Sequence, residues 1–137
     1  MAVRKVFVDT NVILDGLLRN PGFVEDSKRV FSCAERGEIC AFLSSSSVTD
    51  IFYISRKKLT VPVARKAIEV LLNIFEIVSV DESDLRGALT VPISDLEDAL
   101  QAWCAKKAGA EAIITRNSDD FKGIDIPVIS PDKFLKT

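Results

Sequence analysis

Three short apolar runs with no polar alternation place the strongest constraint on the fold of this chain. They cover residues 6–8, 39–43 and 112–115, and helical patterns stand between them. A strand without polar alternation is buried on both faces, as in parallel sheets that carry helices on both sides. Two further strands are expected at 76–80 and 127–129. The sequence therefore predicts a three-layer α/β/α fold around a central, mostly parallel sheet of four to five strands.

Helices are expected where apolar residues recur at three- and four-residue spacing. The clearest example is Val63–Phe75, with Pro62 in a position suited to a first helical turn. Serines 45–47 are candidate N-caps for the helix expected at 48–58. The other predicted helices cover residues 12–18, 23–36, 81–90 and 95–108, with a short one from Pro131. The 137 residues contain no linker-like stretch, so a single domain, 1–137, is expected.

The composition excludes several classes of catalysis and metal site. The chain has no histidine, which excludes Ser-His-Asp and Cys-His catalysis and His-ligated zinc. Its three cysteines are odd in number and lack CxxC spacing, so buried thiols are expected rather than a disulfide framework. No segment has the length and apolarity of a membrane span, and the N-terminus reaches Asp9 too soon for a signal peptide. A cytoplasmic location is therefore expected.

Net charge limits the partners only weakly. The 18 basic and 20 acidic residues give a net charge of −2, and a pI near 5.2 is low for a general nucleic-acid-binding protein. Clustered acids that hold metal ions would lower the pI without repelling a nucleic acid bound beside them, because the cations reverse the local charge. An acidic pI therefore does not exclude a metal-dependent nuclease.

Asp9 is the acidic residue with the most informative position, because it directly follows the first apolar run. In open α/β sheets, ligands bind in the crevice outside the carboxyl ends of the strands, so an acid there is placed for chemistry. The alternative is that Asp9 or Asn11 caps the helix that starts at Val12. Partners for Asp9 elsewhere in the chain favour the first interpretation.

The predicted sheet would gather further polar side chains at the same edge as Asp9. Asp50 begins the helix after the second strand, and Asp98 begins the helix before the fourth. Asn117 and Asp120 follow the fourth strand. Carboxylates a few ångströms apart repel one another and raise each other's pKa unless cations neutralise them. Because the set offers only oxygen ligands, it points to Mg²⁺ or Mn²⁺.

Three segments of the chain resemble the motifs of the PIN domain nucleases, and within them the VapC-like toxins of prokaryotic toxin–antitoxin modules. The segments are Val6–Leu14 (VFVDTNVIL), Asp98–Ala105 (DALQAWCA) and Ile114–Phe121 (ITRNSDDF). They stand in the family's order, and the resemblance covers nearly the whole chain. It implies a PIN-like, Rossmann-like fold and a Mg²⁺- or Mn²⁺-dependent endoribonuclease that hydrolyses RNA phosphodiester bonds.

The resemblance also implies roles for the acidic edge. Asp9 and Asp98 would ligate the metal directly, and Asp50 would ligate it or act through a water. Asn117 and Asp120 would hold the ligands or the metal-bound water in place. Together these five residues are the predicted catalytic set.

Three kinds of partner are expected. RNA phosphates would be contacted by basic residues beside the acids: Arg116, Lys122 and Lys57 or Lys58. A cognate antitoxin is implied by the resemblance. A homodimer is expected because the helix at 63–75, together with the apolar residues 52–54, has more apolar surface than one helix face needs.

Two positions depart from the family pattern. The family usually has Glu where this chain has Asp50, and Asn117 is the amide variant of a position that is often Asp. Asp95 lies one turn before Asp98 and is either a compensating ligand or the helix N-cap. These departures leave a second hypothesis open, in which the chain is a catalytically degenerate PIN module that serves as an RNA-binding or assembly domain.

Overall fold

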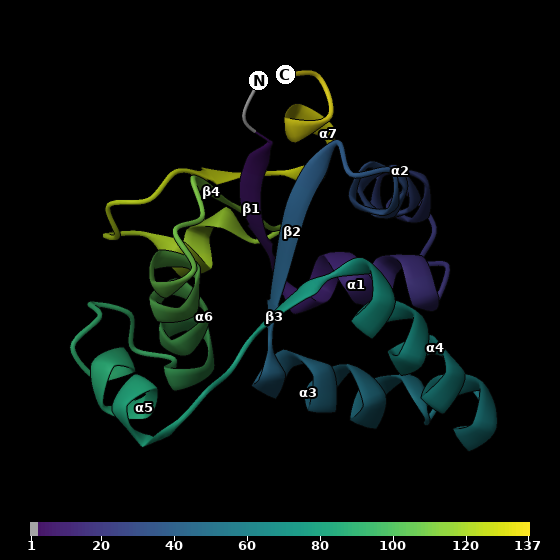
Figure 1. The fold of residues 1–137 in the computed structure, drawn as a ribbon, viewed down its shortest axis with the longest axis horizontal. Coiled ribbons are helices and arrows are strands. Elements are labelled where there is room, and N and C mark those ends of the chain that lie inside the picture. The colour runs from purple at the N-terminus through teal and green to yellow at the C-terminus, as the bar shows by residue number, and fades with distance from the viewer. Residues whose placement is uncertain (1–2) are drawn as a thin grey trace.

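The computed structural model describes residues 3–137 and has one five-stranded sheet between two layers of helices (Figure 1). The strands are β1 (Arg4–Val8), β2 (Ile39–Ser44), β3 (Glu76–Val78), β4 (Ala112–Ile114) and β5 (Val128–Ile129). Their order is β3-β2-β1-β4-β5, and every neighbouring pair is parallel. The predicted three-layer α/β/α fold is confirmed.

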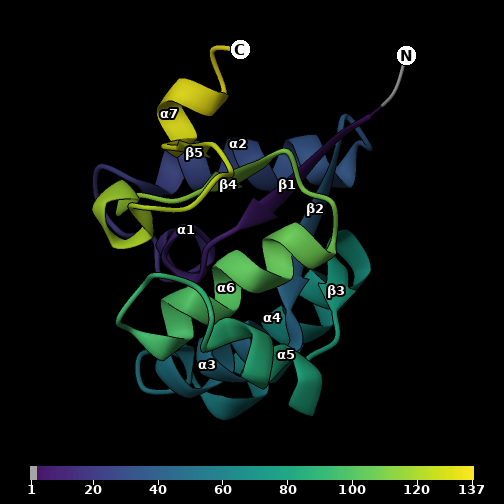
Figure 2. The ribbon, with the colours of Figure 1, turned by 90° about the vertical axis from the view of Figure 1, so that its left-hand side faces the viewer.

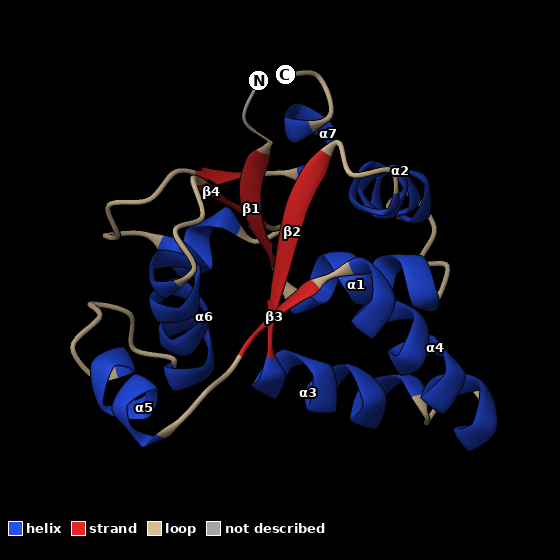
Figure 3. Cartoon of the chain, in the orientation of Figure 1, coloured by secondary structure: helices blue, strands red, loops and turns tan. Residues whose placement is uncertain are grey.

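The helices divide between the two faces of the sheet (Figure 3). On one face lie α1 (Thr10–Leu17), α2 (Val24–Glu35), α3 (Ser45–Ser55), α4 (Val61–Ile74) and α7 (Pro131–Phe134). On the other lie α5 (Glu82–Ala88), α6 (Leu96–Lys107) and the 3₁₀ helix η1 (Ser118–Phe121). None of these helices, within residues 3–137, is long and apolar enough to cross a membrane.

The central strand β1 joins the two apolar cores. Val6, Phe7 and Val8 are all fully buried. Val6 and Val8 belong to the core beneath α1–α4, whereas Phe7 belongs to the core beneath α5 and α6, as the alternation of side chains along a strand requires. The unbroken apolar run in the sequence therefore reflects a strand that is covered on both faces.

Most differences from the predicted boundaries come from the helix caps. Helix α1 begins at Thr10 rather than Val12, because Asp9 is its N-cap. Helix α3 begins at Ser45 because the cap is Ser44, whose hydroxyl accepts a hydrogen bond from Ser47 N at 3.1 Å. The prediction that residues 45–47 supply this cap was wrong by one residue. Of the three free cysteines, only Cys104 is fully buried.

Helices α5 and α6 are joined by a buried carboxylate. Asp84 accepts hydrogen bonds from Trp103 Nε1 at 3.1 Å and from Lys107 Nζ at 2.8 Å. These bonds, led by the one from Lys107, hold the pKa of Asp84 well below its usual range. Gly87, on the same helix as Asp84, faces the ring of Trp103 so closely that an added Cβ would overlap the indole.

Replacing Gly87 by alanine tests this close packing. In an open helix position the change is stabilising by up to about 1 kcal/mol, because glycine is a poor helix former. Here the added methyl group would meet the indole of Trp103, and overpacking typically costs about 1–3 kcal/mol. We therefore expect Gly87→Ala to lower the free energy of unfolding in urea, followed by the fluorescence of the single tryptophan. A higher free energy of unfolding would contradict the close contact.

Candidate active site

Asp9 lies at the carboxyl end of the central strand, at the start of α1. Its Oδ1 accepts a hydrogen bond from Thr10 N at 2.8 Å, and its Oδ2 accepts one from Thr115 Oγ1 at 2.7 Å. Asp9 is only 8% exposed, and this burial raises its pKa although both hydrogen bonds act in the opposite direction. Asp9 is therefore the helix cap and also a desolvated carboxylate, so its role as the cap leaves the predicted role in chemistry open.

Asp98 lies in the first turn of α6. The start of α6 lies on the same side of the molecule as the start of α1 and the segment after β4 (Figure 2). Its pKa is raised to about 6, first by burial and then by the charges of Asp95, Asp120 and Asp9. Three carboxylates from distant parts of the sequence, Asp9, Asp98 and Asp120, therefore influence one another. Asp95 is the N-cap of α6, since its side chain accepts a hydrogen bond from Asp98 N at 3.0 Å.

Asp50 contacts Glu97, a carboxyl that was not among the predicted site residues. Glu97 has a pKa raised to about 7, first by a hydrogen bond from its protonated carboxyl to Asp50, then by burial and by the charges of Asp50, Asp95 and Asp98. Glu97 on α6 therefore interacts both with Asp50 on α3 and with the other carboxylates at the start of α6. The one feature of the sequence that could have pointed to Glu97 is its position next to Asp98.

The segment after β4 supplies the remaining predicted residues. Asn117 is exposed, and its backbone N–H donates to Thr115 Oγ1 at 3.0 Å. Asp120 is also exposed, and its backbone N–H donates to the carbonyl of Asn117 at 3.0 Å. Thr115 was not among the predicted site residues, yet its fully buried hydroxyl joins this segment to Asp9.

A buried polar network holds α3 and α6 against each other behind the acids. Ser44 Oγ donates to Gln101 Oε1 at 3.1 Å, and Gln101 Nε2 donates to Ser47 Oγ at 2.5 Å. All three side chains are at most 1% exposed. Because Asp50 lies one turn after Ser47 and Asp98 one turn before Gln101, this network sets the separation of the helices that carry the two carboxylates.

The predicted phosphate-binding residues divide into two kinds. The guanidinium of Arg116 is bound by the carboxylate of Asp15, with Nε 2.6 Å from Oδ2. Lys122 is 78% exposed and lies 3.4 Å from Asp119. Lys57 and Lys58 are exposed in the turn after α3. The three lysines remain predictions, whereas Arg116 is engaged within the protein.

A polar cleft of about 280 Å³ opens above the acids, with four carboxylates and one lysine in its wall: Asp95, Asp98, Asp119, Asp120 and Lys122. Within residues 3–137, no three acidic or cysteine side chains stand together as a ready-made metal-ligand group. The chemistry of the donors nevertheless fits a hard divalent cation, because burial and neighbouring negative charges raise the pKa of both Asp9 and Asp98, and a cation would offset that charge. Buried next to them, Thr10 Oγ1 has no partner among the described residues, and such hydroxyls usually bind ordered water.

A parallel α/β/α fold with acids from β1, α6 and the β4 segment at one edge defines a class of nuclease-like domains. The sequence profile of the PIN domain family matches residues 5–119 of this chain. The chain therefore belongs to the PIN domain family.

Similar proteins come from several bacteria. The chain is 29% identical to "Ribonuclease VapC1" of Aquifex aeolicus over 141 residues, which cover 99% of this chain and 96% of that protein. It superposes on the DNA-bound VapBC structure from Salmonella typhimurium with a TM-score of 0.72 and 18% identity, covering 94% of this chain and 99% of the other. For VapC20 of Mycobacterium tuberculosis, described as a sarcin-ricin loop cleaving toxin, the TM-score is 0.64 at 14% identity, covering 79% of this chain and 86% of the other.

Proposed function

We propose that this protein is an endoribonuclease that hydrolyses RNA phosphodiester bonds and acts as the toxin of a toxin–antitoxin module. The observation that carries the proposal is the convergence of Asp9, Asp98 and Asp120 at the carboxyl edge of a PIN fold. The similarity to a protein named as a ribonuclease and to a toxin described as cleaving the sarcin-ricin loop supports the same activity. We propose that the protein acts on RNA in the cytoplasm.

The activity that we propose depends on Mg²⁺ or Mn²⁺. Asp9 and Asp98 would hold the cation directly, and Asp50 would act through Glu97 or a water. When bound, the cation would activate a water as nucleophile and stabilise the charge that develops on the phosphate and the departing oxygen. The protein would contribute orientation: the hydroxyl of Thr115 fixes one oxygen of Asp9, and the backbone N–H of Thr10 fixes the other.

A degenerate PIN module that binds RNA without cutting it is the alternative. The observation that favours it is the acidic edge itself, because Asp50 is shorter than the usual Glu and no three carboxylates stand ready as ligands within residues 3–137. Both hypotheses predict RNA binding. Only the nuclease predicts cleavage that requires Mg²⁺ or Mn²⁺ and stops when the cation is chelated.

Replacing Asp98 by asparagine tests the nuclease directly. The variant keeps the shape of the side chain but loses the charge, so we expect the fold to be retained and RNA cleavage in Mn²⁺ or Mg²⁺ to be abolished. Asp125→Asn is the control, since Asp125 is exposed and pairs with Lys106. Cleavage at the wild-type rate by a pure preparation of Asp98→Asn would refute the assignment, and EDTA-resistant cleavage would refute the metal.

Comparing Asp50→Asn with Asp9→Asn tests how Asp50 acts. If Asp50 reaches the cation only through Glu97 or a water, its loss should lower the cleavage rate about 10–100-fold, as is typical of groups that support metal ligands. Loss of Asp9 should abolish cleavage. Glu97→Gln should resemble Asp50→Asn rather than Asp9→Asn. A complete loss in Asp50→Asn would show direct ligation, and unchanged Mn²⁺ affinity and rate would remove Asp50 from the site.

Protein partners are part of the same proposal. Several structural neighbours are toxin–antitoxin complexes, including VapBC proteins from Salmonella typhimurium and Haemophilus influenzae. We infer that this chain likewise binds an antitoxin encoded beside it. A small reading frame next to its gene would support that inference.

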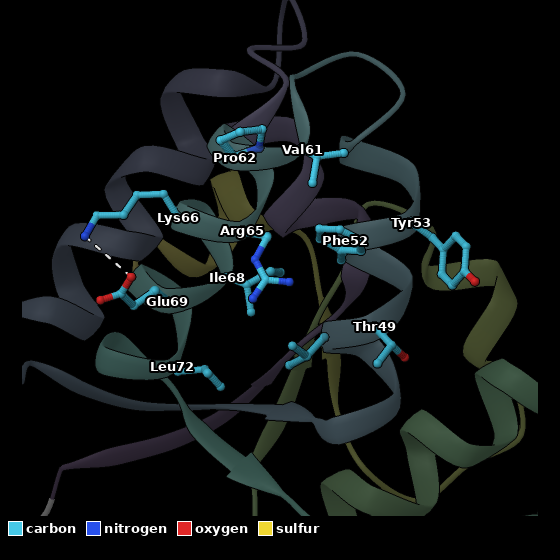
Figure 4. Close-up of a pocket in the computed structure, with 11 residues that line it drawn as sticks. Thr49, Phe52, Tyr53, Val61, Pro62, Arg65, Lys66, Ile68, Glu69 and Leu72 are labelled. Carbon is cyan, nitrogen blue, oxygen red and sulfur yellow. Dashed lines mark hydrogen bonds and ion pairs between the residues drawn. The ribbon is translucent and has the colours of Figure 1, made fainter.

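An apolar groove between α3 and α4 is the surface that we assign to a second copy of this chain (Figure 4). It has a volume of about 850 Å³, and Phe52, Ile68 and Leu72 lie along it. Tyr53 and Leu72, which both line it, are 58% and 51% exposed, and a contiguous exposed apolar patch typically marks an interaction site. The groove thus agrees with the homodimer that residues 52–54 and 63–75 led us to expect.

Replacing Leu72 by glutamate tests the dimer. We expect the wild-type protein to sediment at micromolar concentration with twice the mass of one chain, and Leu72→Glu to sediment as a monomer because a charge would be buried in the interface. Val70→Glu is the matched control, since Val70 is 44% exposed on the same helix but does not line the groove. A monomeric wild-type protein would contradict the dimer, and a dimeric Leu72→Glu would place the interface elsewhere.

A further inference from the structure

The buried ion pair between Asp15 and Arg116 is a feature that the proposed chemistry does not explain. Asp15 lies on α1, and its side chain is only 2% exposed. A carboxylate buried to this extent is costly unless it is paired and hydrogen-bonded. Arg116 supplies both requirements, with Nε 2.6 Å from Oδ2 and Nη2 3.0 Å from Oδ1. The amide of Asn20 donates a further hydrogen bond to Oδ1 at 2.8 Å.

The other side of the guanidinium is also occupied. The ring of Phe23 stacks on Arg116, with the guanidinium carbon 4.3 Å from the ring centroid. Only arginine has a planar group that can form a bidentate pair with a carboxylate and stack on an aromatic ring at the same time. One edge of the guanidinium thus lies on Asp15 and one face on Phe23, so an RNA phosphate could reach this edge only by displacing Asp15.

The ion pair fastens the segment after β4 to α1. Arg116 stands between Thr115, whose hydroxyl donates to Asp9 at 2.7 Å, and Asn117, whose backbone N–H donates to that same hydroxyl at 3.0 Å. Asn11, also on α1, donates from Nδ2 to Thr115 Oγ1 at 3.2 Å. A shift of Arg116 would therefore disturb the Thr115 hydroxyl, which donates the hydrogen bond to Asp9 Oδ2.

We propose that Asp15 and Arg116 form a positioning pair that holds the segment 115–120 on α1 and thereby sets the orientation of Asp9 and the place of Asp120. Neither residue touches the RNA. The proposal rests on the RNA cleavage proposed above, and it predicts that loss of the pair changes the rate of the chemical step rather than the binding of RNA.

The kinetic test uses Asp15→Asn, Arg116→Gln and the double variant, with a fluorogenic RNA oligonucleotide and Mn²⁺. We expect each single variant to lower kcat about 10–100-fold while KM changes little, as for other groups that orient ligands. The double variant should be no slower than the slower single variant, because both substitutions remove the same interaction. Asp15→Asn leaves behind a partly exposed arginine rather than a buried charge, so it is the variant expected to fold without difficulty.

A matched control pair lies at the amino end of β1, at the opposite end of the strand from Asp9. Arg4 pairs with Glu111 at 2.9 Å and lies over the ring of Phe134 at 4.9 Å, but this pair is exposed, at 41% and 49%. Arg4→Gln and Glu111→Gln therefore each remove an arginine–carboxylate pair of the same kind, far from the acids. We expect them to leave kcat and KM unchanged.

Salt dependence separates positioning from RNA contact. If Arg116 bound a phosphate, Arg116→Gln would raise KM, and the slope of log affinity against log salt would fall by about 0.7 for single-stranded RNA. Asp15→Asn would then leave kcat intact. That pattern would overturn the proposal, whereas an unchanged slope with a lowered kcat in both variants supports it.

Hydrogen exchange tests the positioning role even if no RNA is cleaved. In the metal-free protein, Asp15→Asn should increase amide exchange in residues 115–122 relative to the wild type and to Glu111→Gln, because a lost tether makes local opening easier. If the wild-type protein does not cleave RNA, the proposed function fails while faster exchange still supports the positioning pair. Unchanged exchange in this segment would overturn the pair whether or not RNA is cleaved.

Discussion

The burial of one carboxylate at the end of the central strand is the constraint on which the rest of the site depends. Asp9 follows a strand covered on both faces, so its charge is desolvated, and its pKa is raised despite two hydrogen bonds to the carboxylate. A buried charge of this kind persists only where surrounding groups fix and partly neutralise it. The start of α1 supplies a backbone N–H, and the segment after β4 supplies the Thr115 hydroxyl.

Helix α6 carries both carboxylates that lie near Asp9 and a side chain that is buried in the core network. Its first turn carries Glu97 and Asp98 toward the acidic edge, under the cap formed by Asp95. One turn later, Gln101 enters the buried network with the serines of α3. Because the same rigid helix holds the acids and the network, the separation of Asp98 from the α3 carboxylate is set by core packing rather than by surface side chains.

An arginine–carboxylate ion pair lies at each of the two edges where the strands begin and end, but the two pairs differ in their effect. At the amino edge, the pair of Arg4 with Glu111 is exposed, and pairs of this kind contribute little to stability. At the carboxyl edge, the pair of Arg116 with Asp15 has a buried carboxylate and lies one residue from Thr115. The difference in burial means that only the second pair can hold a neighbouring segment rigidly, and it does so beside the cluster of negative charge.

The layers, the parallel sheet and the acids at its carboxyl edge could all be predicted from the order of residues along the chain. This was possible because an apolar run without alternation requires cover on both faces, and parallel strands bring their carboxyl ends to one side. The same order did not reveal Glu97, Thr115 or the engagement of Arg116 by Asp15. Those depend on contacts between residues about 50 to 106 positions apart in the sequence, whose partners and burial are set only when the helices pack. Local pattern decides which residues reach the edge, whereas tertiary packing decides which of them touch and which charges are desolvated.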